Sequence, residues 1–356
     1  MMNILFRNDL ETISRRQFLK LAESGLSSIF LLPILDKWFR SENRLFIGES
    51  KTNQGRILNN QVALYDRPTF KGKVRKLFWY DLILPITDIT VGDTEPSYNR
   101  VWYQMNGEGF VHSGSVQPVE IRTNLPRRNI PPEGLLAEVT VPFTDVLWNI
   151  RHPTSVAYRF YYGTTHWVIS ANEDEKGKIW YRVFDDKWGF IYYGDASHFH
   201  IINPSELEPI SADIPPDKKR MEIHLADQVL IAYEDNIPVC MTRIASGARF
   251  SDGDFRTRTG TYFTNRKRPS RHMAAGDLAA RNSYDLPGVP WISYLTEQGV
   301  AIHGTYWHND FGKPRSHGCI NVTSNAARWI FRWTLPNVPF NVQTLDKDPG
   351  TVVQVA

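Results

Sequence analysis

Short stretches in which polar and apolar residues alternate occur along most of the chain. They include QVALYDRP at 61–68, AYRFYYG at 157–163 and the residues from 221 to 243, whose turns fall at 227–228 and 234–236. Because alternation places every second side chain on one face, each stretch is typical of a half-buried β-strand. The pattern therefore predicts a mainly β protein.

One stretch near the C-terminal end follows a different period. In TSNAARWIFRWT at 323–334, Ala327, Ile330 and Phe331 recur at helical spacing. Thr323 or Ser324 suits the N-cap, since a short side-chain oxygen can accept a hydrogen bond from a free backbone N–H of the first turn. This is the one short helix that we expect in the last third of the chain.

An internal repeat relates two of the strand-rich stretches. NRVWYQMNGEGFVHSGSVQPVE at 99–120 resembles a later stretch, because WY at 102–103 matches WY at 180–181. Each pair is followed by a turn, and then by GF at 109–110 or at 189–190 and an apolar strand. Many short strands separated by polar turns indicate small β-barrels.

Both copies resemble bacterial SH3-type domains, the first over 56–120 and the second over 134–210. Proline-rich polar stretches at 121–133 and 210–220 are typical of linkers. We thus expect two small SH3-like barrels followed by a third domain over 220–345. The resemblance implies that the barrels bind a cell-wall polymer.

Composition and charge change this picture little. The net charge of +3 is too weak to argue for a nucleic-acid partner, and none is expected. A mildly basic surface would suit an anionic polymer such as cell wall, but it is also an ordinary protein surface. Aromatic residues reach 13%, which favours half-buried β-surfaces over helices.

The N-terminal segment, residues 1–45, carries a different signal. SRRQFLK at 14–20 precedes the apolar stretch 21–35, and this order resembles a twin-arginine export signal. It implies an exported protein of the cell envelope, with Arg15 and Arg16 read as an address. No clear cleavage site follows, which leaves an N-terminal membrane anchor open, and an amphipathic surface helix is the plainer alternative.

The chain has two cysteines, Cys240 and Cys319, and the second lies in PRSHGCIN at 314–321. Cys240 lies in an expected strand and is interpreted as a small buried hydrophobe. Cys319 has several interpretations: a nucleophile, an inert core residue, a disulfide partner of Cys240, or a zinc ligand with scattered histidines. The disulfide would abolish thiolate chemistry, and a single cysteine makes a poor zinc site.

A cysteine nucleophile needs a histidine that takes its proton, a third group that fixes the imidazole, and N–H donors for the oxyanion. His303, at the end of the predicted strand at 299–304, can face the thiol across a cleft, whereas His317 lies only two residues before it. Gly318 suits a tight turn that leaves room for a substrate carbonyl.

The two motifs around His303 and Cys319 resemble the signature of a known family. IHG at 302–304 followed by SHGCIN at 316–321 resembles the signature of the L,D-transpeptidases with a YkuD-type catalytic domain. The resemblance implies a β-sandwich fold, Cys319 as nucleophile, His303 as base, the Gly304 carbonyl as its orienting group, an oxyanion hole at Gly318 and Cys319, and His317 lining the acyl site. It places four further residues on the substrate side: Ser316, Asn321 (also a fastener of the loop), Met273 and Arg271. RTGTY at 258–262 matches a further family segment, except that Arg258 stands where proline is usual.

The implied reaction is acyl transfer between peptidoglycan stem peptides, with no cofactor and no metal. Cys319 attacks the amide between the third and fourth stem residues, and an amine of a second stem resolves the thioester. Two other functions remain as alternatives. A cysteine endopeptidase of the NlpC/P60 type would have its nucleophile before its histidine, the reverse of the order here. A catalytically inactive wall-binding protein would not need these site residues together.

Overall fold

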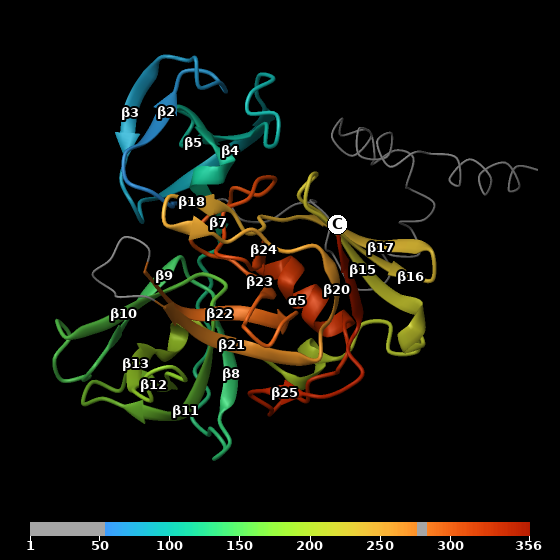
Figure 1. The fold of residues 1–356 in the computed structure, drawn as a ribbon. Coiled ribbons are helices and arrows are strands. Elements are labelled where there is room, and N and C mark those ends of the chain that lie inside the picture. The colour runs from blue at the N-terminus through green and yellow to red at the C-terminus, as the bar shows by residue number, and fades with distance from the viewer. Residues whose placement is uncertain (1–53, 276–282) are drawn as a thin grey trace, which may run out of the picture. The chain divides into compact units, whose positions relative to one another are not determined.

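The structure, a computed structural model, describes residues 54–275 and 283–356 (Figure 1). The expected export signal at residues 1–45 lies outside the described residues. Within the described part of the chain, no helix is long and apolar enough to cross a bilayer.

The first β-module, residues 54–119, is a seven-stranded sheet in the order β3-β2-β6-β5-β4-β1-β7. Its strands are β1 (Gln54–Ile57), β2 (Val62–Tyr65), β3 (Val74–Phe78), β4 (Ile83–Val91), β5 (Val101–Met105), β6 (Gly109–His112) and β7 (Val116–Val119), with the 3₁₀ turn η1 (Ser113–Ser115) before β7. Alternating side chains such as Val111 and Met105 are buried in its core. Trp102 of the WY pair is fully buried.

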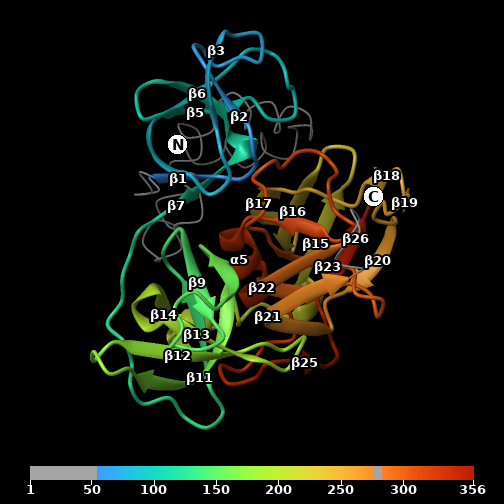
Figure 2. The ribbon, with the colours of Figure 1, turned by 90° about the vertical axis from the view of Figure 1, so that its left-hand side faces the viewer.

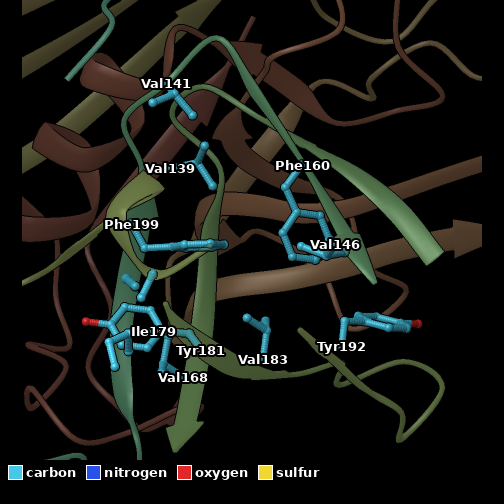
Figure 3. Packing of buried hydrophobic residues seen from close by; sticks show 12 residues of the cluster. Val139, Val141, Val146, Phe160, Val168, Ile179, Tyr181, Val183, Tyr192 and Phe199 are labelled. Carbon is cyan, nitrogen blue, oxygen red and sulfur yellow. The ribbon is translucent and has the colours of Figure 1, made fainter. Parts of the chain in front are cut away.

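The second β-module, residues 135–201, has seven strands in the order β10-β9-β13-β12-β11-β8-β14. They are β8 (Leu135–Val139), β9 (Phe143–Leu147), β10 (Val156–Tyr161), β11 (Thr165–Glu173), β12 (Ile179–Phe184), β13 (Ile191–Asp195) and β14 (Phe199–Ile201), with η2 (Ala196–His198) before β14. Figure 3 shows its core, in which Tyr181 and Val183 of β12 point inward with Val139 and Phe199.

The two modules share one strand order, position for position, and each has a 3₁₀ turn before its last strand. The WY pairs occupy corresponding strands, β5 and β12. The internal repeat predicted from the sequence is therefore confirmed at the level of strand order. That the modules are SH3-like and bind cell wall stays a prediction.

The C-terminal region, residues 219–355, contains two five-stranded sheets and a small hairpin. One sheet has the order β17-β16-β15-β26-β20, from β15 (Lys219–His224), β16 (Val229–Glu234), β17 (Ile237–Arg243), β20 (Gly260–Phe263) and β26 (Val352–Val355). The other has the order β24-β23-β22-β21-β25, from β21 (Arg266–Ala275), β22 (Tyr284–Tyr294), β23 (Ala301–Gly304), β24 (Ile320–Val322) and β25 (Leu345–Asp346). The hairpin pairs β18 (Arg249–Phe250) with β19 (Gly253–Asp254). Two further 3₁₀ turns, η3 (Pro204–Leu207) and η4 (Pro216–Lys218), precede β15.

The α-helix of this region, α5 (Ser324–Trp333), packs against β22 and β23 (Figure 2). Thr323 is its N-cap, because its hydroxyl accepts a hydrogen bond from the N–H of Ala326 at 3.2 Å. Ala327 and Ile330 lie on its buried face, as the helical spacing predicted. A mainly β fold with one short helix near the C-terminal end is confirmed.

Two buried lysines donate hydrogen bonds to carbonyls at the C-terminal end of α5. The Lys267 ammonium is fully buried and donates to three carbonyls, those of Phe331 at 2.5 Å, Thr334 at 2.9 Å and Pro336 at 2.9 Å. Burial lowers the pKa of Lys267 well below its usual value. Lys219 donates to the carbonyl of Trp333 at 3.1 Å. Both side chains satisfy carbonyls that a helix end leaves without partners, at the end that favours positive charge.

Candidate active site

His303 and Cys319 lie on neighbouring parallel strands. His303 belongs to β23, Cys319 immediately precedes β24, and the register pairs Ile302 with Ile320 and His303 with Asn321. Because side chains alternate along a strand, positions 319 and 321 face the same side of the sheet as His303. The fold thus brings the predicted base and the predicted nucleophile to one face from opposite ends of a long loop.

The His303 imidazole is buried and held in one tautomer. Its Nδ1 donates to the carbonyl oxygen of Gly304 at 3.0 Å, so the basic nitrogen is Nε2. Burial lowers the pKa of His303 to about 4, and the bond to Gly304 offsets part of this shift. The imidazole is therefore neutral at neutral pH and can accept a proton. This is the orienting contact that the resemblance implied for Gly304.

Cys319 is a free thiol, and so is Cys240. Burial raises the pKa of the Cys319 thiol to about 11, and a backbone hydrogen bond from Ala301 offsets only part of this shift. Its Sγ lies 3.7 Å from the carbonyl oxygen of Gly299. Burial alone raises the pKa of Cys240 to about 12. The two cysteines form no disulfide, and the resting site holds a thiol and a neutral imidazole on one face of the paired segments.

The turn before Cys319 depends on Gly318 and Ser316. Gly318 has a φ of +117°, a conformation that favours glycine. The Ser316 hydroxyl donates to the Cys319 carbonyl at 2.5 Å and accepts from the Gly318 N–H at 3.1 Å. Ser316 is buried and its hydroxyl is engaged within the turn. The structure therefore gives Ser316 a role in the turn itself, and the substrate contact that the resemblance implies stays a prediction.

Thr257 is a site residue that the sequence analysis missed. Its buried hydroxyl donates to the Gly318 carbonyl at 2.8 Å and accepts from the N–H of Gly247 at 2.9 Å. Gly247 allows this close approach, since a Cβ there would lie 2.9 Å from the Gly318 Cα. Thr257 directly precedes the RTGTY segment, which we matched to the family from Arg258 onward. Extending that match by one residue would have pointed to Thr257.

Asn321 fastens the strand after the nucleophile. Its backbone exchanges hydrogen bonds with Ala245, at 2.9 and 3.0 Å. Its side-chain nitrogen lies 3.0 Å from Nε2 of His308, so Nε2 accepts a hydrogen bond there. Burial lowers the pKa of His308 to about 3, which keeps this acceptor unprotonated. The buried Asn321 fastens the loop through these bonds, and its predicted substrate contact stays a prediction.

His317 points away from this bonding network. Its exposed ring stacks on Phe250 at 4.7 Å and contacts Phe255 edge-on, also at 4.7 Å. Tyr284 of β22 completes the group, with ring centroids 6.1 Å apart. Burial, and secondarily the adjacent Cys319, raise the pKa of Tyr284. His317 therefore stands in an aromatic wall beside the thiol and takes no part in orienting His303.

The remaining predicted substrate residues, Met273 and Arg271, both lie on β21. Met273 and Cys319 both pack against the buried cluster that contains Ala301, and the predicted substrate contact of Met273 stays a prediction. Arg271 instead pairs with Asp186 of the second β-module at 2.6 Å. Its charge therefore already has a carboxylate partner in the second β-module, and the prediction that it contacts substrate stays a prediction.

The zinc alternative finds no support in the side-chain arrangement. Among residues 54–275 and 283–356, no group of three or more His, Cys, Asp or Glu side chains is placed to hold a metal ion. His308 bonds to Asn321 and His317 stacks on Phe250, so the histidines around Cys319 point to different partners.

Comparisons with known proteins agree with this site. Residues 218–355 match the family model of the YkuD L,D-transpeptidase catalytic domain. No curated protein matches the chain.

Several solved structures are similar to parts of the chain. An Enterococcus faecium L,D-transpeptidase mutant is 22% identical, covering 39% of this chain and 50% of its own, with a TM-score of 0.30. An L,D-transpeptidase from Mycobacterium smegmatis is 16% identical, covering 76% of this chain and 100% of its own, with a TM-score of 0.32. The chain spans about half the length of the Enterococcus faecium structure. At these TM-scores the superpositions carry no argument, and the assignment rests on the family match. Residues 218–355 of this chain therefore belong to the YkuD family of L,D-transpeptidase catalytic domains.

Proposed function

We propose that this protein is a peptidoglycan L,D-transpeptidase that works through a thioester on Cys319. The observation that carries the proposal is the His303 tautomer. Nδ1–H of His303 is bonded to the Gly304 carbonyl, which leaves Nε2 as a base on the same face of adjacent strands as the Cys319 thiol. A buried base and thiol on neighbouring strands are what acyl transfer to a cysteine requires.

In the acylation step, Cys319 Sγ attacks the carbonyl carbon of the amide between the third and fourth residues of a stem peptide. Because the resting thiol is protonated, His303 Nε2 takes the thiol proton as the S–C bond forms. The C–N bond then breaks, and the imidazolium returns that proton to the leaving amine of the terminal residue. The products are a thioester on Cys319 and a free amino acid.

The oxyanion of the tetrahedral intermediate needs N–H donors at the turn. The Gly318 N–H already donates to Ser316 Oγ at 3.1 Å, so we assign the oxyanion first to the N–H of Cys319. The Gly318 N–H would join it by sharing its hydrogen with both oxygens. The bond from Thr257 to the Gly318 carbonyl keeps this peptide from rotating away.

An amine of a second stem peptide resolves the thioester. Its nitrogen attacks the acyl carbon, His303 takes the amine proton, and the C–S bond breaks to return the thiol and a new amide. The aromatic wall of Phe250, Phe255 and His317 gives this reaction an apolar flank that disfavours water as the competing nucleophile.

The wider setting is part of the same proposal. The repeated β-modules would hold the enzyme on the cell-wall polymer, and the twin-arginine segment would export it to the cell envelope. Whether that segment is cleaved or stays as an anchor follows from the mass of the mature protein.

The test is intact-protein mass spectrometry after incubation with a carbapenem, whose strained amide stands in for the donor amide. We expect a single adduct on the wild type and on Cys240→Ala, and none on Cys319→Ala. A stem tetrapeptide with an amine acceptor should then give a cross-linked product with the wild type and with Cys240→Ala, and none with Cys319→Ala. An adduct on Cys319→Ala, or full turnover by that variant, would refute the proposed mechanism.

A further inference from the structure

The segment that links the His303 strand to the Cys319 turn, residues 305–315 and hereafter the connecting segment, is bonded to the first β-module. The first contact comes from Arg56 of β1, whose Nη2 donates to the carbonyl oxygen of Tyr306 at 2.5 Å. Near the other end, Lys313 Nζ donates to the hydroxyl of Tyr98 at 2.7 Å. The loop between the two catalytic residues is therefore held by a part of the chain far upstream in sequence.

Arg56 is a rigid anchor because its guanidinium is fully buried and has several fixed partners. Nη1 donates to Asp81 Oδ1 at 2.8 Å, and Nε and Nη2 donate to Gln117 Oε1 at 3.0 and 2.8 Å. The guanidinium also lies over the ring of Tyr161, 4.1 Å from its centroid. A buried charge with this many partners has little freedom to move, so the Tyr306 carbonyl is fixed with it.

Asn309 is the second anchor. Its backbone N–H donates to the Gly114 carbonyl at 3.4 Å, and its side chain donates to the carbonyls of Ser113 at 3.2 Å and Val116 at 3.0 Å. The two segments of the chain approach closely here, since a Cβ on Gly114 would lie 2.7 Å from Asp310 Oδ1. A side chain at position 114 would therefore displace Asp310 of the connecting segment.

Residues at and between the two anchors meet the catalytic groups. The ring of Trp307 lies 5.8 Å from the ring of His303, centroid to centroid. His308 bonds to Asn321, two residues after Cys319. Tyr306 belongs to the buried cluster against which Cys319 packs. A displacement of the connecting segment would therefore reach both His303 and Cys319.

We propose that the first β-module is a positioning part of the transferase site, which acts through Arg56 and Asn309 on the connecting segment. The inference rests on the proposed function, but assigns this module a role in catalysis apart from any wall binding. Proton transfer between His303 and Cys319 depends on their separation and angle, and a displacement of about 1 Å can cost about 100-fold in rate. Arg56 touches no reacting atom, so its effect is on geometry.

The test compares two variants of the full chain, Arg56→Met and Asn309→Ala, with a matched control. Arg159→Met is the control, because Arg159 shares Asp81 with Arg56 but places its other bonds on Asp145 of the second β-module. For each protein we would measure the melting temperature, the limiting rate of carbapenem acylation with its half-saturation concentration, and alkylation of Cys319 by iodoacetamide at high pH.

Assays run well below each melting temperature separate positioning from unfolding. We expect acylation by Arg56→Met and Asn309→Ala to fall about 10- to 100-fold, with half-saturation and alkylation within about twofold of wild type. Arg159→Met should acylate within about twofold of wild type. Arg56→Lys, which restores one donor, should recover part of the rate.

The outcomes distinguish this inference from the proposed function. If Arg56→Met and Asn309→Ala are both acylated at the wild-type rate while Cys319→Ala is inactive, the positioning role of the first β-module is refuted. The proposed function would still stand. If Arg56→Met melts below the assay temperature, Asn309→Ala decides. Alkylation that falls together with acylation would also count against positioning, because alkylation needs the thiolate and not His303.

Discussion

The protonation state of Cys319 gives the sharpest test of the site. Burial raises the pKa of its thiol to about 11, so about one molecule in 10⁴ carries a thiolate at pH 7. A free cysteine, with a pKa of about 8.5, is ionised in about 3 molecules in 100. A thiolate of higher pKa is intrinsically the better nucleophile, which recovers about tenfold of the difference. Alkylation of Cys319 at pH 7 should therefore be about 30-fold slower than that of a free thiol.

The assay is the rate of iodoacetamide alkylation by mass spectrometry, from pH 6 to pH 11, in a Cys240→Ala background that leaves Cys319 as the one reacting cysteine. The rate should rise about tenfold per pH unit and level off near the thiol pKa of about 11. The same protein unfolded in urea should level off near pH 8.5, which provides the free-thiol reference.

Carbapenem acylation of the same variant should behave differently. Its acid limb follows His303, whose pKa burial lowers to about 4, and the thiol stays protonated up to about pH 11. Since the imidazole takes the proton during attack, the rate should be flat within about threefold between pH 6 and pH 9. An alkylation rate that levels off below pH 8 would mean a resting thiolate–imidazolium pair, and the reasoning from burial would be refuted.

Three further predictions follow from the bonds described above. Thr257→Val keeps the shape of the side chain but removes two buried hydrogen bonds. It should slow acylation about tenfold and lower the free energy of unfolding, measured by urea titration, by about 1–3 kcal/mol. Unchanged acylation would show that Thr257 does not contribute to the site. Lys267→Met should cost about 3–5 kcal/mol in the same titration, because three buried carbonyls at the end of α5 lose their hydrogen-bond donor, and a stability equal to wild type would contradict this. Burial alone would lower the pKa of His272, but hydrogen bonds to Asp185 and Asp285 raise it above its usual 6.5. The melting-temperature gap between wild type and His272→Gln should thus be full below about pH 6.5 and shrink as pH rises through the raised pKa; a gap that widens with pH would reverse the sign.

The sequence sufficed where local chemistry decides the structure. Alternation predicted the strands around Ile223 and Ile231, and the spacing of Ala327 and Ile330 predicted α5 with Thr323 or Ser324 as its cap, of which the structure has Thr323. The WY and GF matches predicted two modules of one topology. These features depend on neighbours in sequence or on a repeated pattern, which a reader of the chain can compare directly.

The sequence did not suffice where partners come from distant parts of the chain. Arg271 was expected on the substrate side, and nothing local in its sequence indicates the ion pair that it forms with Asp186 of the second β-module. Ser316 and Asn321 were expected on the substrate side, and their neighbours in sequence do not indicate the bonds that Ser316 makes to the Cys319 carbonyl and Asn321 makes to His308. Arg56 gave no signal at all, because a buried arginine in a short strand looks like any surface cation until its partners are known.

The neutral resting pair explains why distant anchors should matter in this site. A standing thiolate–imidazolium pair is held together by its own charges and tolerates small displacements. A thiol and a neutral imidazole have no such attraction, so their alignment must come from the strands and from the connecting segment. The two lines of reasoning are therefore linked: if Cys319 proves to be a resting thiolate, the expected loss in Arg56→Met should shrink as well. If Cys319 of the wild type alkylates rapidly at pH 7 and Arg56→Met still loses acylation, then alignment by the connecting segment is needed even for a resting thiolate–imidazolium pair.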